Sequence, residues 1–354
     1  MGELYLLTGA AGHLGTALVK LLKEKHKKIR ALVLPEEKHL SQLSGEDIEI
    51  VYGDIRSKKS LEPFFQNPDH QELIVVHMAG IVSISSGYLQ AVSDVNVGGT
   101  KNIVELCKKH RVERLIYVSS VHAIPELPLG QTIREISQFD PSSVIGLYAK
   151  TKAEATQLVL NAAKEGLNAS VVHPSGIIGP YDYGRGHLTQ LVIDYLKGRL
   201  TACVNGGYDF VDVRDVAKGI LACSEGGEPG RGYILSGHYI TISGMLRRIG
   251  KAARLIYRPI CLPLRLARLA APYYERRCLK EKKPLFFTPY SIAVLGSNGR
   301  FSHSAATERF AYRPRPIEQT LQDMTAWLVG QRAAAGTPFR GALLRSRGVC
   351  QVKG

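Results

Sequence analysis

The stretch LYLLTGAAGHLG, residues 4–15, decides the fold: an apolar run enters a loop with glycines at positions 9, 12 and 15. The run has the composition of a buried strand, and a helical pattern begins at His13. In such a unit one glycine allows the tight turn, the second lets the backbone approach a pyrophosphate, and the third lets the helix pack close to the sheet. The loop is therefore predicted to bind a dinucleotide through Gly9, Gly12, His13, Leu14 and Gly15. A purely structural turn is the alternative.

Short apolar runs alternate with helical patterns through the first 175 residues. After the first run, the predicted strands are 29–34, 48–53, 73–80, 114–120 and 169–174. The predicted helices between them are 13–25, 58–66, 96–110 and 143–165. This alternation predicts an α/β fold with a Rossmann-type, doubly wound parallel sheet over residues 1–175.

The rhythm changes after Pro174, where loops rich in Gly, Tyr and Pro appear. They are followed by amphipathic patterns at about 213–224, 241–253, 262–280 and 317–330. Residues 176–330 are therefore predicted to form a smaller C-terminal substrate lobe, with some later segments returning to the first domain. Residues 331–354 are predicted to be a disordered basic tail.

The net charge of +15 is concentrated in two segments. Residues 247–283 hold 12 basic and two acidic side chains, and residues 331–354 hold five basic and none acidic. The rest of the chain is balanced, so no nucleic-acid partner is expected. Residues 247–283 form either the solvated basic face of a lobe helix or a basic amphipathic surface that makes weak contact with a membrane.

Cysteine usage and hydropathy indicate the compartment. The six cysteines show no metal-ligand spacing, which favours reduced thiols and no metal site. The first residues lack the pattern of a signal peptide, and the most apolar candidate span, residues 255–274, contains three arginines. These features predict a cytoplasmic protein.

Three residues form a candidate catalytic group. Tyr148 and Lys152 lie four residues apart on one helix face, and Ser120 ends a strand 28 residues earlier. An ammonium near a phenol favours the phenolate, which helps the tyrosine to move a proton near neutral pH. A surface Tyr–Lys pair is the alternative, but the carboxyl edge of a parallel sheet, where Ser120 is placed, is where ligands bind.

Together these motifs resemble the extended branch of the short-chain dehydrogenase/reductase superfamily, the NAD-dependent epimerase/dehydratase family. The similarity covers roughly residues 3–330. It is carried by the glycine loop, the Ser120–Tyr148–Lys152 group, and the segments 53–55, 77–80, 96–100 and 210–217. The resemblance implies an NAD(P)(H) cofactor. It further implies that the cofactor is contacted by Asp54, Ile55, Ala79, Gly80, Ile81, Tyr148, Lys152, Pro174, Ser175 and Ile177.

The resemblance also implies roles for the catalytic group. Tyr148 is the acid/base, Lys152 tunes it and binds the nicotinamide ribose, and Ser120 hydrogen-bonds the substrate oxygen. Ser119 is the neighbouring alternative to Ser120. The second predicted strand ends without a carboxylate or a cation, and the missing carboxylate, with Lys38 or His39 nearby, tilts the cofactor prediction slightly toward NADP(H).

The residues directly after Ser120 narrow the reaction. Val121-His122 lacks the Asp-Glu of sugar dehydratases, and the Val-Tyr-Gly typical of sugar epimerases is missing. Segments 289–292, 298–302 and 311–316 resemble dihydroflavonol reductases and 3β-hydroxysteroid dehydrogenases. The resemblance thus implies an oxidoreductase that interconverts a secondary alcohol and a ketone on a bulky apolar substrate.

Two other functions remain open at this point. One is a nucleotide-sugar epimerase with retained NAD, and the other is a non-catalytic protein that senses a dinucleotide. Loop positions after the fifth and sixth strands supply the candidate substrate residues, His122, Tyr183, Arg185 and His187. Family resemblance further suggests a homodimer through the helices near 96–110 and 143–165.

Overall fold

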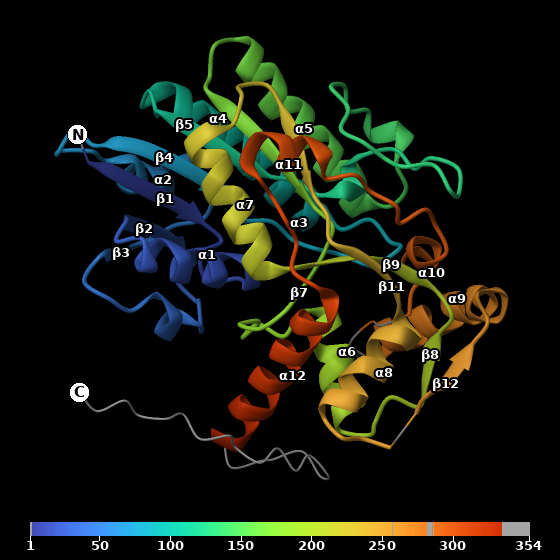
Figure 1. The fold of residues 1–354 in the computed structure, drawn as a ribbon. Coiled ribbons are helices and arrows are strands. Elements are labelled where there is room, and N and C mark those ends of the chain that lie inside the picture. The colour runs from blue at the N-terminus through green and yellow to red at the C-terminus, as the bar shows by residue number, and fades with distance from the viewer. Residues whose placement is uncertain (1, 257, 282–284, 286, 335–354) are drawn as a thin grey trace.

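The computed structural model describes residues 2–256, 258–281, 285 and 287–334. Its central sheet has seven parallel strands in the order β3-β2-β1-β4-β5-β6-β10 (Figure 1). Their bounds are β1 Glu3–Thr8, β2 Lys28–Val33, β3 Ile48–Tyr52, β4 Glu72–His77, β5 Arg114–Val118, β6 Ala169–Pro174 and β10 Gly232–Leu235. The strand order reverses between β1 and β4, which is where doubly wound sheets open a ligand crevice.

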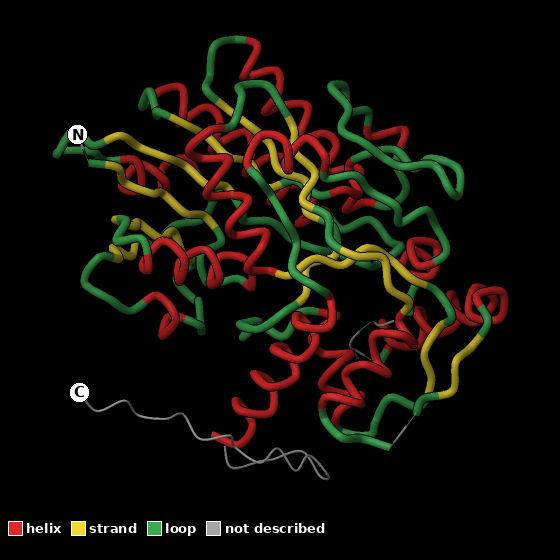
Figure 2. The backbone as a smooth tube through the Cα atoms, viewed as in Figure 1, coloured by secondary structure: helices red, strands yellow, loops and turns green. Residues whose placement is uncertain are grey.

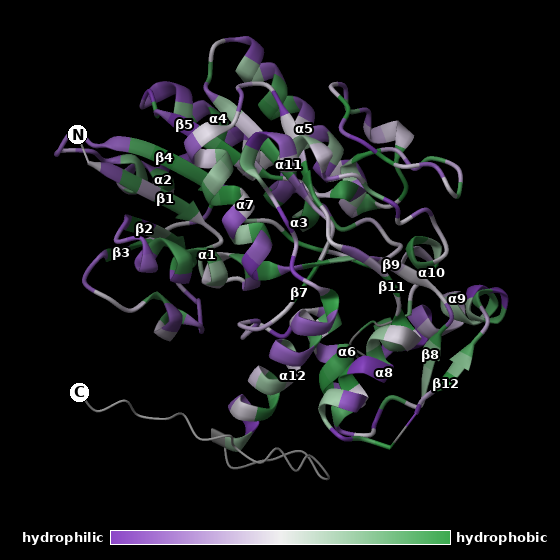
Figure 3. Ribbon diagram, viewed as in Figure 1, coloured by the Kyte–Doolittle hydropathy of each residue, from purple (hydrophilic) through white to green (hydrophobic). Residues whose placement is uncertain are grey.

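Helices cover both faces of this sheet because its strands are apolar on both sides. Figure 3 shows the hydrophobic colouring of β4, for example, in which five of six residues are buried. One face packs against α1 (His13–Glu24) and α7 (Val213–Gly226). The other packs against α2 (Lys58–Phe65), α4 (Thr100–Lys109) and α5 (Leu147–Lys164). Each face thus has its own hydrophobic core.

A smaller part of the molecule is attached at the carboxyl edge of the sheet (Figure 2). It contains a three-stranded sheet, β11-β9-β7, and a two-stranded sheet, β12-β8. The strands are β7 Gly176–Ile178, β8 Ala202–Val204, β9 Gly207–Asp212, β11 His238–Thr241 and β12 Ile260–Leu262. The accompanying helices are α6 His187–Leu196, α8 Ile242–Ala252, α9 Leu264–Lys280, α10 Pro289–Leu295, α11 Ser304–Phe310 and α12 Ile317–Ala334.

The predicted doubly wound parallel sheet is confirmed, and most element boundaries agree within a few residues. The strand predicted over 73–80 ends at His77, because the chain then turns along the crevice. The helix predicted over 96–110 is instead a short helix, α3 (Gln90–Ser93), a π-helical turn over Asp94–Gly99, and α4. Such turns are common at functional sites.

Two further segments differ in detail from the prediction. The helix predicted over 317–330 continues to Ala334, so residues 331–334 of the predicted tail are helical, and residues 335–354 lie outside the described part. The seventh strand, β10, was not predicted as a strand, although later segments were expected to return to the first domain. It pairs in parallel with β6, a strand that lies much earlier in the chain.

Of the cysteines in the described residues, Cys107, Cys203, Cys223 and Cys278 are buried and Cys261 is exposed, all as free thiols. Cys350 lies outside these residues. Among the described residues, no three His, Cys, Asp or Glu side chains cluster in a way that could hold a metal ion. The same part of the chain contains no helix of the length and hydrophobicity needed to cross a membrane.

Candidate active site

A cavity of about 610 Å³ opens at the point where the strand order reverses. One wall, which we call the strand-end wall, is made by segments 9–15, 78–80, 118–122 and 174–177 together with Tyr148 and Lys152. The opposite wall, the lobe wall, is made by the segment 182–189 and Tyr290. This volume is in the range of small-molecule and cofactor pockets.

The glycine loop at the bottom of the strand-end wall has the shape of a diphosphate cradle. Gly9 has a φ of 72°, and a Cβ there would lie 2.8 Å from the backbone nitrogen of Ala79. A Cβ on Gly15 would overlap the carbonyl oxygen of Gly9. Gly12 begins α1 without a side-chain cap, so the first amides of this helix are left for a ligand. The described residues therefore fit a dinucleotide diphosphate at this point.

The candidate catalytic group is brought together at the middle of the cavity. Tyr148 and Lys152 are buried in the first turns of α5, and Ser120 follows β5. All three line the cavity. Neighbouring Ser119 also borders the cavity, but its hydroxyl bonds the Thr156 hydroxyl at 2.6 Å inside the core. The geometry therefore favours Ser120 over Ser119 as the residue that faces a ligand.

Burial controls the protonation of this group. It raises the pKa of Tyr148 to about 12, while a hydrogen bond with Ser120 opposes the rise. Burial also lowers the pKa of Lys152 to about 7. Lys152 Nζ donates to the Val118 carbonyl oxygen at 2.8 Å. In this geometry the neutral phenol is therefore favoured, because the tyrosine pKa is set by burial and by Ser120 and not, as expected, by Lys152.

Two motifs act as supports behind the cavity. His77 joins β1 to α4, with its ring nitrogens 2.7 Å from the Thr8 hydroxyl and 3.0 Å from the Thr100 hydroxyl. Asn96, in the π-helical turn, accepts from the backbone N–H of Ile81 at 2.8 Å and donates to the Thr151 hydroxyl at 3.1 Å. These bonds fix the chain after β4 against α5, the helix that carries Tyr148 and Lys152.

An aromatic cluster around His122 and Tyr290 lies between the two walls of the cavity. His122 stacks on Tyr208 with ring centroids 5.3 Å apart, and its ring edge faces Tyr148. The Tyr290 hydroxyl lies 3.5 Å from His122 Nδ1, and the Tyr290 ring occupies the space beside Gly146 at the start of α5. Burial lowers the pKa of His122 to about 4, so the imidazole is neutral at pH 7.

Most of the predicted site residues line this cavity: Gly9, Gly12, His13, Leu14, Gly15, Gly80, Ser120, His122, Tyr148, Lys152, Pro174, Ser175, Ile177 and His187. Six others do not line it. Ala79 packs beside Gly9, Ile81 is held by Asn96, and Ile55 is buried under Gly99. The carboxylate of Asp54 pairs with Arg56, whose side chain lowers the pKa of Asp54.

The side chains of the remaining two predicted residues lie outside the cavity. Tyr183 packs edge-on against Trp327 of α12, with ring centroids 5.2 Å apart. Arg185 is exposed and has a left-handed φ of 52°. The structure therefore places neither side chain in the wall of the cavity, although both belong to the loop that covers it.

Several lining residues were not predicted, namely Met78, Val82, Ser83, Ile84, Val118, Leu188, Thr189 and Tyr290. Tyr290 carried a signal only through the resemblance of segment 289–292, which did not indicate that it reaches the cavity. Tyr208 was also missed, although it lies in a Gly- and Tyr-rich stretch whose composition is typical of a binding loop.

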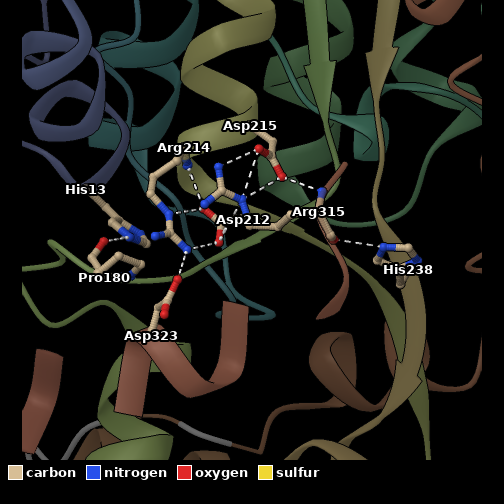
Figure 4. Close-up of polar contacts among 8 residues, drawn as sticks. All are labelled: His13, Pro180, Asp212, Arg214, Asp215, His238, Arg315 and Asp323. Carbon is tan, nitrogen blue, oxygen red and sulfur yellow. Dashed lines mark hydrogen bonds and ion pairs between the residues drawn. The ribbon is translucent and has the colours of Figure 1, made fainter. Parts of the chain in front are cut away.

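A partly buried ion-pair network lies beside the cavity (Figure 4). Arg214 pairs with both Asp212 and Asp323 at 2.7 Å, which ties α7 to α12. Arg315 pairs with Asp215 at 2.7 Å. In the same view His13 Nε2 donates to the carbonyl oxygen of Pro180 at 2.9 Å. This bond joins the glycine loop to the loop of the lobe wall.

The chain is similar in sequence to several known proteins. The family model described as the NAD dependent epimerase/dehydratase family matches residues 5–235. Sterol demethylase protein B of Methylococcus capsulatus is 30% identical over 327 residues, which cover 91% of this chain and 97% of that protein. A putative dihydroflavonol 4-reductase of Synechocystis is 29% identical, over 92% of this chain and 95% of its own.

Partial and structural matches agree with these relatives. The 3 beta-hydroxysteroid dehydrogenase type 7 of Mus musculus is 27% identical over 47% of this chain and 46% of its own length. Among solved structures, that of a protein named gox2253 superposes with a TM-score of 0.79 and 28% identity. It covers 93% of this chain and 98% of that one.

Proposed function

Because the chain belongs to the NAD dependent epimerase/dehydratase family, we propose that it is an NAD(P)-dependent oxidoreductase interconverting a secondary alcohol and a ketone. The family membership confirms the resemblance found in the sequence, including its dihydroflavonol reductase-like and hydroxysteroid dehydrogenase-like relatives. The proposed substrate is bulky and apolar. The proposed catalytic residues are Ser120, Tyr148 and Lys152.

The observation that carries this proposal is the convergence of these three side chains in one cavity with the glycine cradle. Tyr148 is protonated at neutral pH because burial raises its pKa to about 12, so it can donate a proton to a ketone oxygen during reduction. Ser120 is placed to hydrogen-bond the same oxygen as negative charge develops on it. Lys152, with its pKa lowered to about 7, can supply the next proton.

The cofactor is proposed to lie along the strand-end wall. Gly9, Gly12 and Gly15 would hold its diphosphate, and Lys152 would reach its nicotinamide ribose. When bound, the nicotinamide ring supplies or accepts the hydride. The preference for NADP(H) stays a prediction. Near Lys38 and His39 the Glu37 carboxylate accepts a hydrogen bond from the backbone N–H of His39 at 2.9 Å. The Michaelis constants for NADH and NADPH would measure the preference.

The substrate class is supported by the cavity and by the relatives. The lining contributes the apolar side chains of Val82, Ile84, Leu188 and Tyr290 alongside the polar Ser83, Asp182 and Thr189. Two relatives have names that refer to sterols or steroids. A flat, polycyclic alcohol or ketone is therefore the proposed substrate. The expected homodimer through α4 and α5 stays a separate prediction.

The test combines a substrate panel with one substitution. Hydroxysterols, ketosteroids, dihydroflavonols and UDP-sugars are supplied with each cofactor, and reduced cofactor is followed at 340 nm. We expect turnover of a polycyclic alcohol or ketone, and a loss of about a thousandfold in kcat for Tyr148→Phe because the proton donor is removed. Exposed Tyr88→Phe is the matched control and should leave kcat unchanged.

Two outcomes would contradict the proposal. Full activity of Tyr148→Phe would remove the tyrosine from catalysis. Conversion of a UDP-sugar with retained cofactor and no net change at 340 nm would favour the epimerase.

A further inference from the structure

Helix α9 exposes an apolar stripe on the side that faces away from the protein. Its inner side is built from small residues, with Ala267 and Ala271 buried against Ile292 of α10. On the opposite side Leu269 is 80% exposed and Tyr273 is 72% exposed. Leu266 lies on the same side and is also exposed, and residues three and four positions apart are neighbours on a helix. A helix that only covers a core does not need this second apolar stripe.

Basic side chains flank the stripe. Arg265, Arg276 and Lys280 are exposed on the same side of α9, and no carboxylate of the described residues lies within ion-pair distance of them. The charge of Arg277 is paired with Glu281, whose Oε1 lies 2.8 Å from Arg277 Nε. We call Arg265, Leu266, Leu269, Tyr273, Arg276 and Lys280 the α9 outer face. Hydrophobic and hydrophilic colours alternate along α9 in Figure 3, at the end of the molecule remote from β1–β3.

We propose that the α9 outer face docks on the surface of an anionic lipid membrane. The leucines and the tyrosine enter the boundary between headgroups and acyl chains, and the three cations pair with lipid phosphates. A second copy of this face is disfavoured, because a symmetric contact would bring like charges together. A nucleic acid would use the cations but would leave the leucines in water.

The chain connects this face to the cavity through a short segment. The carboxylate of Glu275, on the inner side of α9, accepts from the backbone N–H of Ser86 at 2.7 Å. Thr288, which caps α10, donates to the Ile84 carbonyl oxygen at 2.6 Å. Val82, Ser83 and Ile84 line the cavity, so α9 and α10 hold the segment that borders its opening.

Docking on lipid would therefore place the rim of the cavity near the membrane. A polycyclic substrate could then pass from the bilayer to the cavity without crossing water. This consequence rests on the proposed function, whereas the docking itself does not.

Co-sedimentation with vesicles tests the docking. The full chain is mixed with vesicles of phosphatidylcholine and phosphatidylglycerol, and with vesicles of phosphatidylcholine alone, in low salt. We expect binding to the anionic vesicles that weakens in high salt. Each removed charge should weaken binding about fivefold, so Arg265→Gln with Arg276→Gln should weaken it about twenty-five-fold. Leu269→Ser should weaken it about tenfold because an inserted leucine is lost.

Matched controls come from other exposed positions. Lys59→Gln with Lys164→Gln removes the same charge elsewhere, and Leu129→Ser changes a leucine that is 77% exposed. Both should bind like the wild type. Absence of binding to anionic vesicles, or equal binding by α9 variants and controls, would overturn the docking. So would loss of a dimer on Leu269→Ser, which would assign the face to a second copy. Neither cofactor nor substrate is present, so this result is independent of the proposed reaction.

Discussion

The strand-end wall and the lobe wall of the cavity are assembled in different ways. The strand-end wall comes from short segments that follow β1, β4, β5 and β6, which the parallel register brings to one edge. The lobe wall depends on contacts between distant parts of the chain, such as Tyr290 and His122, which are 168 residues apart. Its loop also needs left-handed backbone at Gly179, Tyr181 and Arg185. One wall is thus fixed by sheet topology and the other by tertiary packing.

The largest effect that this comparison predicts is on stability in acid. His77 and His173 are buried beneath the strand-end wall, and burial lowers their pKa values to about 3 and about 4. Their unfolded value is about 6.5. Between pH 6.5 and about 4 the unfolded chain therefore binds more protons, so the free energy of unfolding falls as the pH falls. Between pH 7 and pH 5 these two histidines together should lower the free energy of unfolding by about 4 kcal/mol, which chemical denaturation measures.

Single histidine variants sharpen this prediction. His77→Gln should reduce the loss of stability between pH 7 and pH 5 by about 2 kcal/mol, which is the share of one buried histidine. Exposed His70→Gln should leave the dependence unchanged. If the wild type is equally stable at pH 7 and pH 5, the strand-end wall does not rest on buried neutral histidines.

The second prediction concerns the glycine cradle of the same wall. Gly15→Ala should weaken dinucleotide binding about a hundredfold, because its Cβ would overlap the Gly9 carbonyl oxygen and force the loop to move. Titration of NADH and NADPH by calorimetry measures the change. Gly98→Ala is the matched control, since a Cβ there meets no atom within 4 Å. Equal affinities for the two variants would show that the cradle tolerates a side chain.

The two walls also explain what sequence can predict. The strand ends, the glycine loop and the Ser120–Tyr148–Lys152 group follow from local patterns and from the rule that parallel strands share a carboxyl edge. Asp54 shows the limit of this reasoning, because its position was predicted but its pairing with Arg56 was not. Tyr183 and Arg185 were chosen by loop position, and no local pattern reveals that one side chain packs on Trp327 and the other faces solvent.

The lobe wall was the harder part for the same reason. Tyr290 sits at the start of a seven-residue helix, and the capping box of Thr288 and Ser291 predicts only where that helix begins. Its place in the cavity depends on Gly146, which has a φ of 92° and no side chain to exclude the Tyr290 ring. Such a fit between a glycine and a distant ring is decided by packing, which one sequence does not display.

The smallest effect is predicted for the Tyr290 hydroxyl, which tests whether the lobe wall takes part in the chemistry. Tyr290→Phe keeps the ring against Gly146 but removes the hydroxyl that lies 3.5 Å from His122 Nδ1. We expect kcat/KM to fall about fivefold, as for one neutral hydrogen bond, with cofactor affinity unchanged. Tyr88→Phe is the exposed control.

Measuring kcat and KM separately distinguishes two possible roles of the Tyr290 hydroxyl. A rise in KM alone would mean that Tyr290 binds the substrate, and a fall in kcat would mean that it positions His122 beside Tyr148. An unchanged kcat/KM would confine the chemistry to the strand-end wall. The lobe wall would then act only by shape, and substitutions there should change which substrates fit without changing the rate for a good one.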